Sequence, residues 1–182
     1  TNEVSRWIME RVAARPRGEV LAVGFVYPAT NSAVTPATVA DFAQKAGIRS
    51  QLPDNLTLAL GTGEVVMLEI ANAYATLQSM GKYAEPVMLV RVADSRGVIL
   101  EEHHAAFEET LPPAVAYLTT SMMRSVVEEG TATAVKELER PAAGKTGTAQ
   151  EFRDAWFSGF TAELVASAWI GCIRGNGVRP FL

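Results

Sequence analysis

The stretch AGKTGTAQ at residues 143–150, followed by DAWFSGF at residues 154–160, decides the fold predicted for this chain. One cation, Lys145, stands among glycines and threonines at the start of an expected strand. Glycines let the backbone of a ligand approach closely, while hydroxyls, N–H groups and one positive charge suit an anion. The stretch therefore predicts a strand that binds a carboxylate.

Three strands are expected in this region, and their tight connections favour antiparallel neighbours. They span residues 142–150, 155–161 and 164–171. Strand alternation puts Lys145 and Gly147 on one face and Thr146 and Thr148 on the other. An edge position or a local twist must therefore let these groups converge on one ligand. The aromatic residues of the second and third strands are expected to pack in the core.

Three helices and a hairpin are expected before these strands. The helices begin at Thr35–Pro36, after residues 61–63 and at Pro112–Pro113, and end at Gly47, Gly81 and Gly130. Apolar spacing predicts three buried faces: Val39, Phe42, Ala43 and Ala46; Met67, Ile70, Ala71, Tyr74 and Ala75; Val115, Leu118, Met122 and Val126. The hairpin surrounds the turn at residues 94–97, with a polar linker after it. A further helix over residues 1–12 and a strand over residues 18–24 are expected at the start.

The composition bounds the function of the chain. With 182 residues and 48% hydrophobic residues, it has the size of about one domain and can bury a core. The net charge of −4 without a basic block argues against nucleic acid. The apolar stretch at residues 65–77 is too short to span a membrane, so we expect any export signal or membrane anchor to lie outside these residues.

Cys172 is alone and forms no internal disulfide. His103 and His104 lack the ligand spacing of a metal site, so no metal is expected.

Three segments, at residues 58–77, 117–131 and 144–171, together resemble the transpeptidase domain of bifunctional, class A penicillin-binding proteins. The runs VVEEGT at residues 126–131 and DAWFSG at residues 154–159 are more specific than the Lys-Thr-Gly triplet alone. The resemblance implies an α/β (α+β) fold, an antiparallel sheet with helices on both faces, as in serine β-lactamases. It also implies that residues 1–182 form a single transpeptidase-like domain that lacks some segments of the family.

In this family, a serine attacks the penultimate carbonyl of a D-Ala-D-Ala stem peptide, and a lysine one helical turn away removes its proton. An amine of a neighbouring stem then resolves the acyl-enzyme, and no cofactor takes part. The resemblance implies that Lys145, Thr146, Gly147 and Thr148 contact the substrate and its carboxylate. It also implies that the N–H group of Thr148 is an oxyanion donor. Lys145 and Thr148 are thus expected to be catalytic.

The serine nucleophile of the family and its lysine are not evident in this chain. The only Ser-x-x-Lys in the sequence, Ser79 to Lys82, crosses the expected end of the second helix, so we expect it to be structural. The second motif of the family survives at best at residues 29–31, where Ala29 replaces its serine. Asn31 is a third expected catalytic residue, which would bind the substrate's amide. An ordinary asparagine in a turn is an equally good interpretation of Asn31.

Two hypotheses account for the missing nucleophile segment. Either the sequence joins pieces of a longer chain, or the chain is a truncated homologue that binds without reacting. Joined pieces predict breaks near residues 24–28, 34–36 and 172–176, with adjacent Cα atoms much farther apart than about 3.8 Å.

The resemblance favours a peptidoglycan D,D-transpeptidase that binds stem peptides and β-lactam antibiotics. It implies a place at the extracytoplasmic face of the cytoplasmic membrane, in the periplasm or cell envelope, where other proteins of cell-wall synthesis are possible partners. The alternative is a catalytically inactive penicillin-fold module for binding or assembly. A serine β-lactamase would need a hydrolytic glutamate loop, which no segment supplies.

Overall fold

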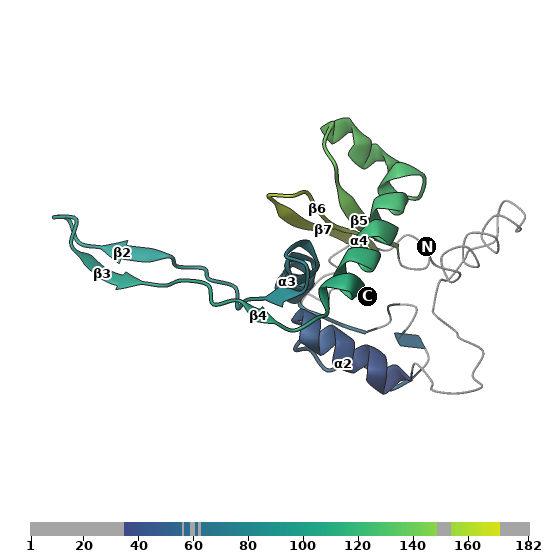
Figure 1. The fold of residues 1–182 in the computed structure, drawn as a ribbon, viewed down its shortest axis with the longest axis horizontal. Coiled ribbons are helices and arrows are strands. Elements are labelled where there is room, and N and C mark those ends of the chain that lie inside the picture. Colours follow the sequence, from purple (N-terminus) through teal and green to yellow (C-terminus); the bar gives the residue numbers. More distant parts are fainter. Residues whose placement is uncertain (1–34, 56, 59–60, 62, 149–153, 172–182) are drawn as a thin grey trace, which may run out of the picture. The chain divides into compact units, whose positions relative to one another are not determined.

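The computed structural model describes residues 35–148 and 154–171, apart from residues 56, 59–60 and 62. All of these belong to one compact unit that begins at Thr35. The helices are α2 (Pro36–Ala46), α3 (Met67–Gln78), α4 (Pro113–Glu128) and the 3₁₀ helix η2 (Thr133–Leu138), as Figure 1 shows. The strands are β1 (Lys82–Tyr83), β2 (Arg91–Ala93), β3 (Ile99–Glu102), β4 (Glu108–Glu109), β5 (Ala143–Thr148), β6 (Asp154–Phe160) and β7 (Val165–Gly171). Helices combined with antiparallel sheets confirm the predicted α/β class.

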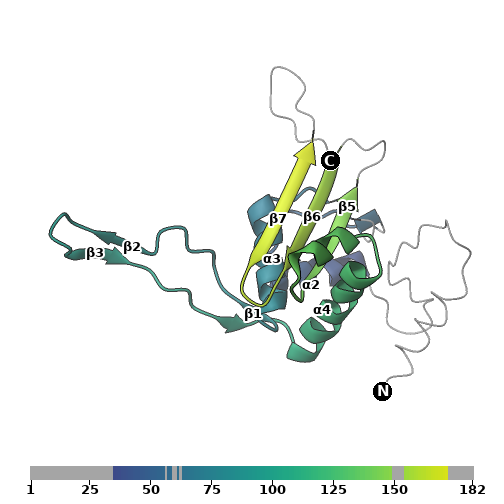
Figure 2. The same ribbon diagram turned by 90° about the horizontal axis from the view of Figure 1, so that it is seen from above.

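The sheet that carries the Lys-Thr-Gly segment has the strand order β5-β6-β7, and both strand pairs are antiparallel. Figure 2 shows the three strands side by side. Lys145 lies opposite Ser158, which lies opposite Ser167 on β7. The three strands predicted from the sequence are confirmed. In the part of the chain that the structure describes, β5 has β6 as its only strand neighbour and is an edge strand.

The two faces of this sheet differ in burial. On one face, Phe160 belongs to the core, and Tyr74 of α3 meets it edge-on with the ring centroids 6.3 Å apart. Lys145 lies on this same face, because its partner Ser158 is two residues from Phe160 along β6. On the opposite face, the side chains of Ala168 and Ile170 are exposed, and Ile170 keeps 76% of its surface. The helix α3 thus covers the face that carries Lys145.

The helix α2 follows its local sequence signals closely. The side chain of Thr35 caps the helix by accepting a hydrogen bond from the N–H of Thr38 at 3.2 Å. Gly47 ends it with φ 121°, and its N–H donates to the carbonyl of Ala43 at 3.1 Å. The predicted ends are therefore confirmed. The predicted face is right for Ala46, which is buried, and wrong for Phe42, which is exposed.

The buried face of α3 is predicted in part, because Ile70 and Tyr74 pack against the core as expected. Ala73, Thr76 and Leu77 are buried, whereas the predicted core residue Met67 is exposed. Thr76 is tolerated in the core because its hydroxyl donates to the carbonyl of Ala46 at 2.9 Å. This bond joins α3 to the end of α2, a contact that apolar spacing along one helix cannot reveal.

The helix α4 begins as predicted but is rotated relative to the predicted face. Its buried residues are Ala116, Met123 and Val127, whereas the predicted core residues Val115, Leu118 and Met122 are exposed. Ala116 has no exposed surface, because a small side chain allows close approach of the neighbouring elements. Apolar residues occupy two adjacent stripes on this helix, so their spacing alone did not identify the inner one.

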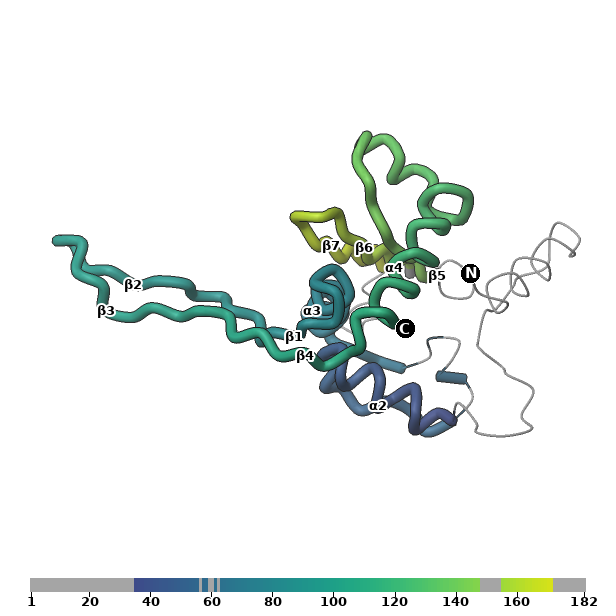
Figure 3. The backbone as a smooth tube through the Cα atoms, viewed as in Figure 1, coloured from purple at the N-terminus to yellow at the C-terminus, as the bar shows by residue number. Residues whose placement is uncertain are grey.

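The predicted hairpin is present as β2 and β3, which run side by side in Figure 3. The N–H of Asp94 donates to the carbonyl of Val98 at 2.9 Å and closes the predicted turn. The polar linker predicted after the hairpin is wrong in part, because its last residues form β4 and pair with β1. Gly81 joins this pair to α3: its carbonyl accepts the N–H of Leu111 at 3.1 Å.

Several predictions lie outside the described residues. They are the helix over residues 1–12, the strand over residues 18–24, Asn31, the proposed breaks at residues 24–28 and 172–176, and residue 34 of the proposed break at 34–36. Among the described residues, no helix has the length and apolar character needed to cross a membrane.

Candidate functional site

The ammonium group of Lys145 lies at the edge strand β5. Its side chain is exposed, and Nζ donates to the carbonyl oxygen of Thr146 at 2.7 Å. Within the described ranges, no carboxylate lies within ion-pair distance of this ammonium group. An exposed edge lysine also discourages unwanted strand pairing, so position alone does not assign a role. The contacts of the neighbouring residues bear on whether Lys145 binds an anion or only protects the strand edge.

The hydroxyl of Thr146 is held by a partner from another element. Oγ1 of Thr146 lies 2.7 Å from Oγ1 of Thr131, which follows the end of α4. Lys145 and Thr131 therefore both reach Thr146, one at its carbonyl and the other at its hydroxyl. Strand alternation puts the side chains of Lys145 and Thr146 on opposite faces of β5, but the ammonium group of Lys145 still reaches the backbone carbonyl of Thr146. The sequence analysis assigned no role to Thr131.

A tight turn at the end of α4 positions Thr131. The N–H groups of Gly130 and Ala132 both donate to the carbonyl of Val126, each at 3.1 Å. A Cβ atom at position 130 would lie 2.8 Å from the Cα and carbonyl oxygen of Val126, so glycine allows this close approach. Ala132 is buried and anchors the far side of the turn. The sequence signal for this contact is the Gly-Thr pair just beyond the helix.

Glycines in the sheet make room for aromatic rings. A Cβ atom at Gly144 would lie 2.8 Å from Cζ of Phe157, and one at Gly159 would lie 2.7 Å from the same atom. The ring of Phe157 therefore lies over both glycines, which are neighbours across β5 and β6. At Gly147 the nearest atom is Cβ of Trp156, at 3.2 Å. Gly144 and Gly147 therefore place no side chain on β5 on either side of Lys145.

Buried contacts on β6 and β7 pack the part of the sheet that lies across from Lys145. Ser158, directly opposite Lys145, is 4% exposed, and its hydroxyl lies 2.9 Å from that of Ser167. Trp156 and Trp169 pack with their ring centroids 6.2 Å apart at a tilt of 47°. These aromatic residues pack within the sheet, as expected.

The structure places only part of the predicted site. Lys145, Thr146 and Gly147 lie consecutively on β5, and the backbone of Thr148 continues the strand opposite Ala155. The side chain of Thr148 lies outside the described part, as does Asn31. The described arrangement combines a cation, a hydroxyl held by Thr131 and a strand edge without a described neighbour, a combination that can receive an anion.

Ser79 and Lys82 do not form a catalytic pair. Ser79 is the C-cap of α3, and its hydroxyl donates to the carbonyl of Ala75 at 2.8 Å. Lys82 lies beyond the helix, in β1, after Gly81 with φ 94°. The serine and lysine therefore do not lie one turn apart on a continuous helix, the arrangement that would place a hydroxyl beside its lysine base.

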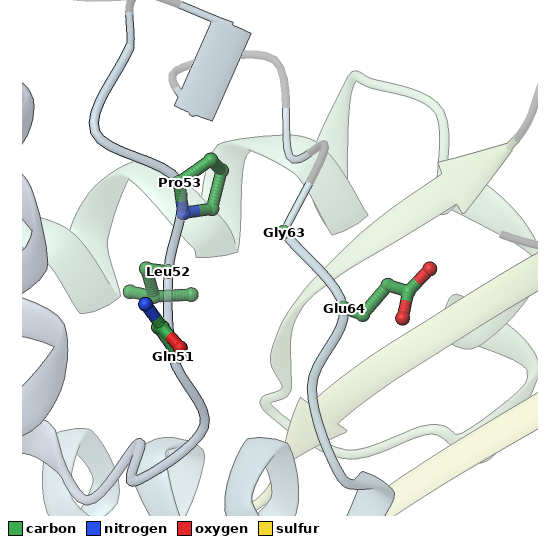
Figure 4. Close-up of a pocket in the computed structure, with 5 residues that line it drawn as sticks. All are labelled: Gln51, Leu52, Pro53, Gly63 and Glu64. Carbon is green, nitrogen blue, oxygen red and sulfur yellow. The ribbon is translucent and has the colours of Figure 1, made fainter.

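An open pocket of about 350 Å³ lies between the segments before α3, and Figure 4 shows its lining. It is lined by Gln51, Leu52, Pro53, Gly63 and Glu64. Figure 4 shows the carboxylate of Glu64 directed away from Leu52 and Pro53. Because the lining holds no cation or nucleophile and no β5 residue, we do not assign the carboxylate site to it.

Two ionisable groups near α3 have shifted pKa values. Burial raises the pKa of Tyr74 to about 12. Burial also acts to raise the pKa of Glu69, but hydrogen bonds from Ser50 and from the backbone of Arg49 and Val66 together outweigh it and leave this pKa below its usual value. The Oγ and N–H of Ser50 lie 2.7 Å and 3.0 Å from Oε2 of Glu69. These bonds join the segment at Ser50 to α3, which carries Glu69.

The two histidines are exposed on the hairpin. Nε2 of His103 lies 2.6 Å from Glu101, and Nε2 of His104 lies 3.8 Å from Glu102. No cluster of three or more potential metal ligands occurs among the residues that the structure describes.

The sequence of this chain is similar to those of known proteins. Residues 32–169 match the family model of the penicillin binding protein transpeptidase domain. The chain is 38% identical over 133 residues to penicillin-binding protein 1A of Aquifex aeolicus, covering 73% of this chain and 18% of that protein. It is 35% identical over 144 residues to penicillin-binding protein 2D of Bacillus subtilis, covering 75% of this chain and 20% of that protein. The chain thus spans about a fifth of the length of these relatives.

Solved structures share the fold. The penicillin-binding protein PonA1 of Mycobacterium tuberculosis matches with a TM-score of 0.65 and 29% identity, over 78% of this chain and 42% of that one. PonA1 has also been solved in complex with penicillin V. Penicillin-binding protein 1A of Haemophilus influenzae matches with a TM-score of 0.69 and 23% identity, over 75% of this chain and 26% of that one, which shows the fold alone.

Proposed function

The chain belongs to the family of transpeptidase domains of class A penicillin-binding proteins, and from this we propose that it is part of a peptidoglycan D,D-transpeptidase. Its substrate is the D-Ala-D-Ala end of a stem peptide, and penicillins occupy the same site. The observation that carries the proposal is the edge strand β5, where Lys145 has no carboxylate partner within the described residues. A cation in that position can meet the terminal carboxylate of a peptide.

We assign one half of the reaction to β5. Lys145, Thr146 and Thr148 contact the terminal carboxylate, and Gly147 lets the peptide backbone approach. The N–H of Thr148 is one of two donors to the oxyanion that forms when a serine attacks the penultimate carbonyl. Asn31 binds the substrate's amide. The open outer edge of β5 and the absence of a side chain at Gly147 support these roles.

The other half of the reaction needs a serine and its lysine. The attacking oxygen forms an ester with the penultimate D-Ala, the terminal D-Ala leaves with a proton, and an amine of a second stem peptide then takes the acyl group. The full sequence holds one Ser-x-x-Lys, and Ser79 within it caps α3. We therefore name no nucleophile.

Labelling with a fluorescent penicillin tests the proposal. A covalent band that survives denaturation demonstrates a nucleophile, and Lys145→Ala should weaken the band. Heat-denatured protein is the control for non-specific labelling. A wild-type chain without any covalent band contradicts catalytic activity of this chain.

A second candidate is a catalytically inactive penicillin-fold module that binds or assembles. The geometry of Ser79 and Lys82 favours it, since these residues do not share a helix face. Saturable but reversible binding of the same penicillin distinguishes this candidate from an enzyme.

The proposed substrate places the domain at the extracytoplasmic face of the cytoplasmic membrane, because peptidoglycan is cross-linked there. Other proteins of cell-wall synthesis are its proposed partners. We further propose that residues 1–182 act as one transpeptidase-like domain.

A further inference from the structure

We infer that Thr131 is a positioning residue: its hydroxyl orients the hydroxyl of Thr146 toward the terminal carboxylate of a D-Ala-D-Ala peptide. The inference rests on the proposed function of β5 and deepens it. It begins from the 2.7 Å contact between the two hydroxyl oxygens, which come from different elements fifteen residues apart. The contact therefore depends on the packing of α4 against β5, not on local sequence.

A hydrogen bond donated by Thr131 accounts for what this residue contributes. A threonine hydroxyl can donate one proton and accept others. When Thr131 donates to Thr146, the proton of Thr146 is left for a further acceptor, and hydrogen bonds in a chain strengthen one another. Lys145 reaches the carbonyl of this same residue at 2.7 Å. In the proposed complex, a carboxylate at Thr146 accepts from the oriented hydroxyl, and Lys145 supplies a cation from the neighbouring position on β5.

The position of Thr131 is fixed by the backbone. The N–H groups on either side of it, from Gly130 and Ala132, both donate to the carbonyl of Val126. A side chain at position 130 would collide with the backbone of α4, and Ala132 is buried. The hydroxyl of Thr131 is therefore presented to Thr146 by a constrained turn.

The exposure of Thr131 argues against a purely structural role. Its side chain is exposed, so water can satisfy its hydroxyl in the absence of Thr146. Removing an exposed hydroxyl has little effect on stability. The chief consequence of the contact is then the orientation of Thr146, which ligand binding measures and unfolding does not.

The test compares two ligands that differ only in charge at one end. Acetylated D-alanyl-D-alanine is titrated as the free acid and as its C-terminal amide, with the amide N–H signal of Gly147 followed by NMR. We expect the wild-type chain to prefer the acid. Thr131→Val should weaken binding of the acid by about threefold to tenfold while leaving the amide unchanged, because bonds to ionised groups are stronger than neutral ones.

Two further variants serve as controls. Thr131→Ser keeps the hydroxyl and should keep the preference for the acid. Thr119→Val removes a hydroxyl from α4 that donates to its own helix, at the carbonyl of Val115, 2.9 Å away, and should change neither affinity. If Thr131→Val fails to fold, as judged by its urea midpoint, Thr131→Ala replaces it.

A double-mutant cycle with Thr146→Val tests the coupling. If Thr131 acts through Thr146, the double variant loses no more affinity for the acid than Thr146→Val alone. Additive losses would overturn the inference, as would an unchanged acid-to-amide ratio in Thr131→Val. In both cases the wild type still prefers the acid, so the proposed function stands. A wild type that binds the two ligands equally, or neither, would overturn both.

Discussion

Replacement of Gly144 by alanine tests how the sheet around Lys145 is built. The added methyl would lie 2.8 Å from Cζ of Phe157 and 2.9 Å from the carbonyl oxygen of Ser158. Carbon atoms in contact are about 3.5–4.0 Å apart, so the ring has to retreat by roughly 0.7–1.2 Å. It already lies over Gly159 on the neighbouring strand. The ring can therefore move only by losing contact with the sheet.

The expected cost follows from two opposing effects. Overpacking of this kind costs about 1–3 kcal/mol. An alanine in place of a glycine reduces the entropy of the unfolded chain and returns about 0.4–1 kcal/mol. We expect Gly144→Ala to lower the free energy of unfolding by about 1–2 kcal/mol. Gly147→Ala should cost less, because its methyl would meet Trp156 only at 3.2 Å.

Urea unfolding followed by tryptophan fluorescence measures this cost, since Trp156 and Trp169 both lie in the sheet. The decisive comparison repeats Gly144→Ala in a Phe157→Ala background. Without the ring, the penalty at position 144 should fall to the part caused by the Ser158 carbonyl. An equal penalty in both backgrounds would refute the view that the ring fills the space above Gly144.

Three further perturbations have expected outcomes. Gly81→Ala should cost at least about 3 kcal/mol in urea unfolding, because its φ is 94° and its methyl would lie 2.2 Å from the carbonyl oxygen of Leu111; a loss below about 1 kcal/mol would contradict this. The free energy of unfolding should be insensitive to Tyr74 ionisation below about pH 10 and fall between about pH 10 and 12, because burial raises the folded-state pKa above the unfolded one; Tyr74→Phe should remove that fall, and an unchanged fall would exclude Tyr74 as its source. Ser158→Ala should cost about 1–3 kcal/mol by leaving the hydroxyl of Ser167 unpaired; replacing both serines should cost less than the sum of the single changes.

Elements with strong local signals were predictable from the sequence. The ends of α2 follow from Thr35 and Gly47, and the structure shows both caps. The strands β5, β6 and β7 were predicted because short connections join apolar segments, which favours antiparallel pairing. In these cases, the deciding interactions lie within a few residues along the chain.

Features that depend on distant contacts were missed. The buried side of α4 differs from the prediction because the close approach at Ala116 is decided by packing with other elements. The pairing of β1 with β4 joins two-residue strands far apart in sequence, which leave no periodic pattern. The contact of Thr131 with Thr146 depends on the same kind of long-range packing, so the sequence analysis gave Thr131 no role.

The candidate site was predictable to the extent that it is local. Lys145 to Thr148 form one strand, as predicted, and this strand lies at the edge of the sheet in the described part of the chain. The roles of these residues, and of Asn31, remain predictions of family resemblance and chemistry.

The most direct test of the carboxylate site is an anisotropy titration of a fluorescent penicillin with the wild-type chain and Lys145→Ala. It detects binding whether or not a covalent bond forms. We expect saturable binding by the wild type and a loss of about tenfold or more in Lys145→Ala, because a charged hydrogen bond contributes about 1.5–3 kcal/mol. Lys136→Ala, at an exposed position on η2, should bind as the wild type does. Equal affinities for the wild type and Lys145→Ala, or no binding by the wild type, would contradict the claim that β5 holds the ligand carboxylate.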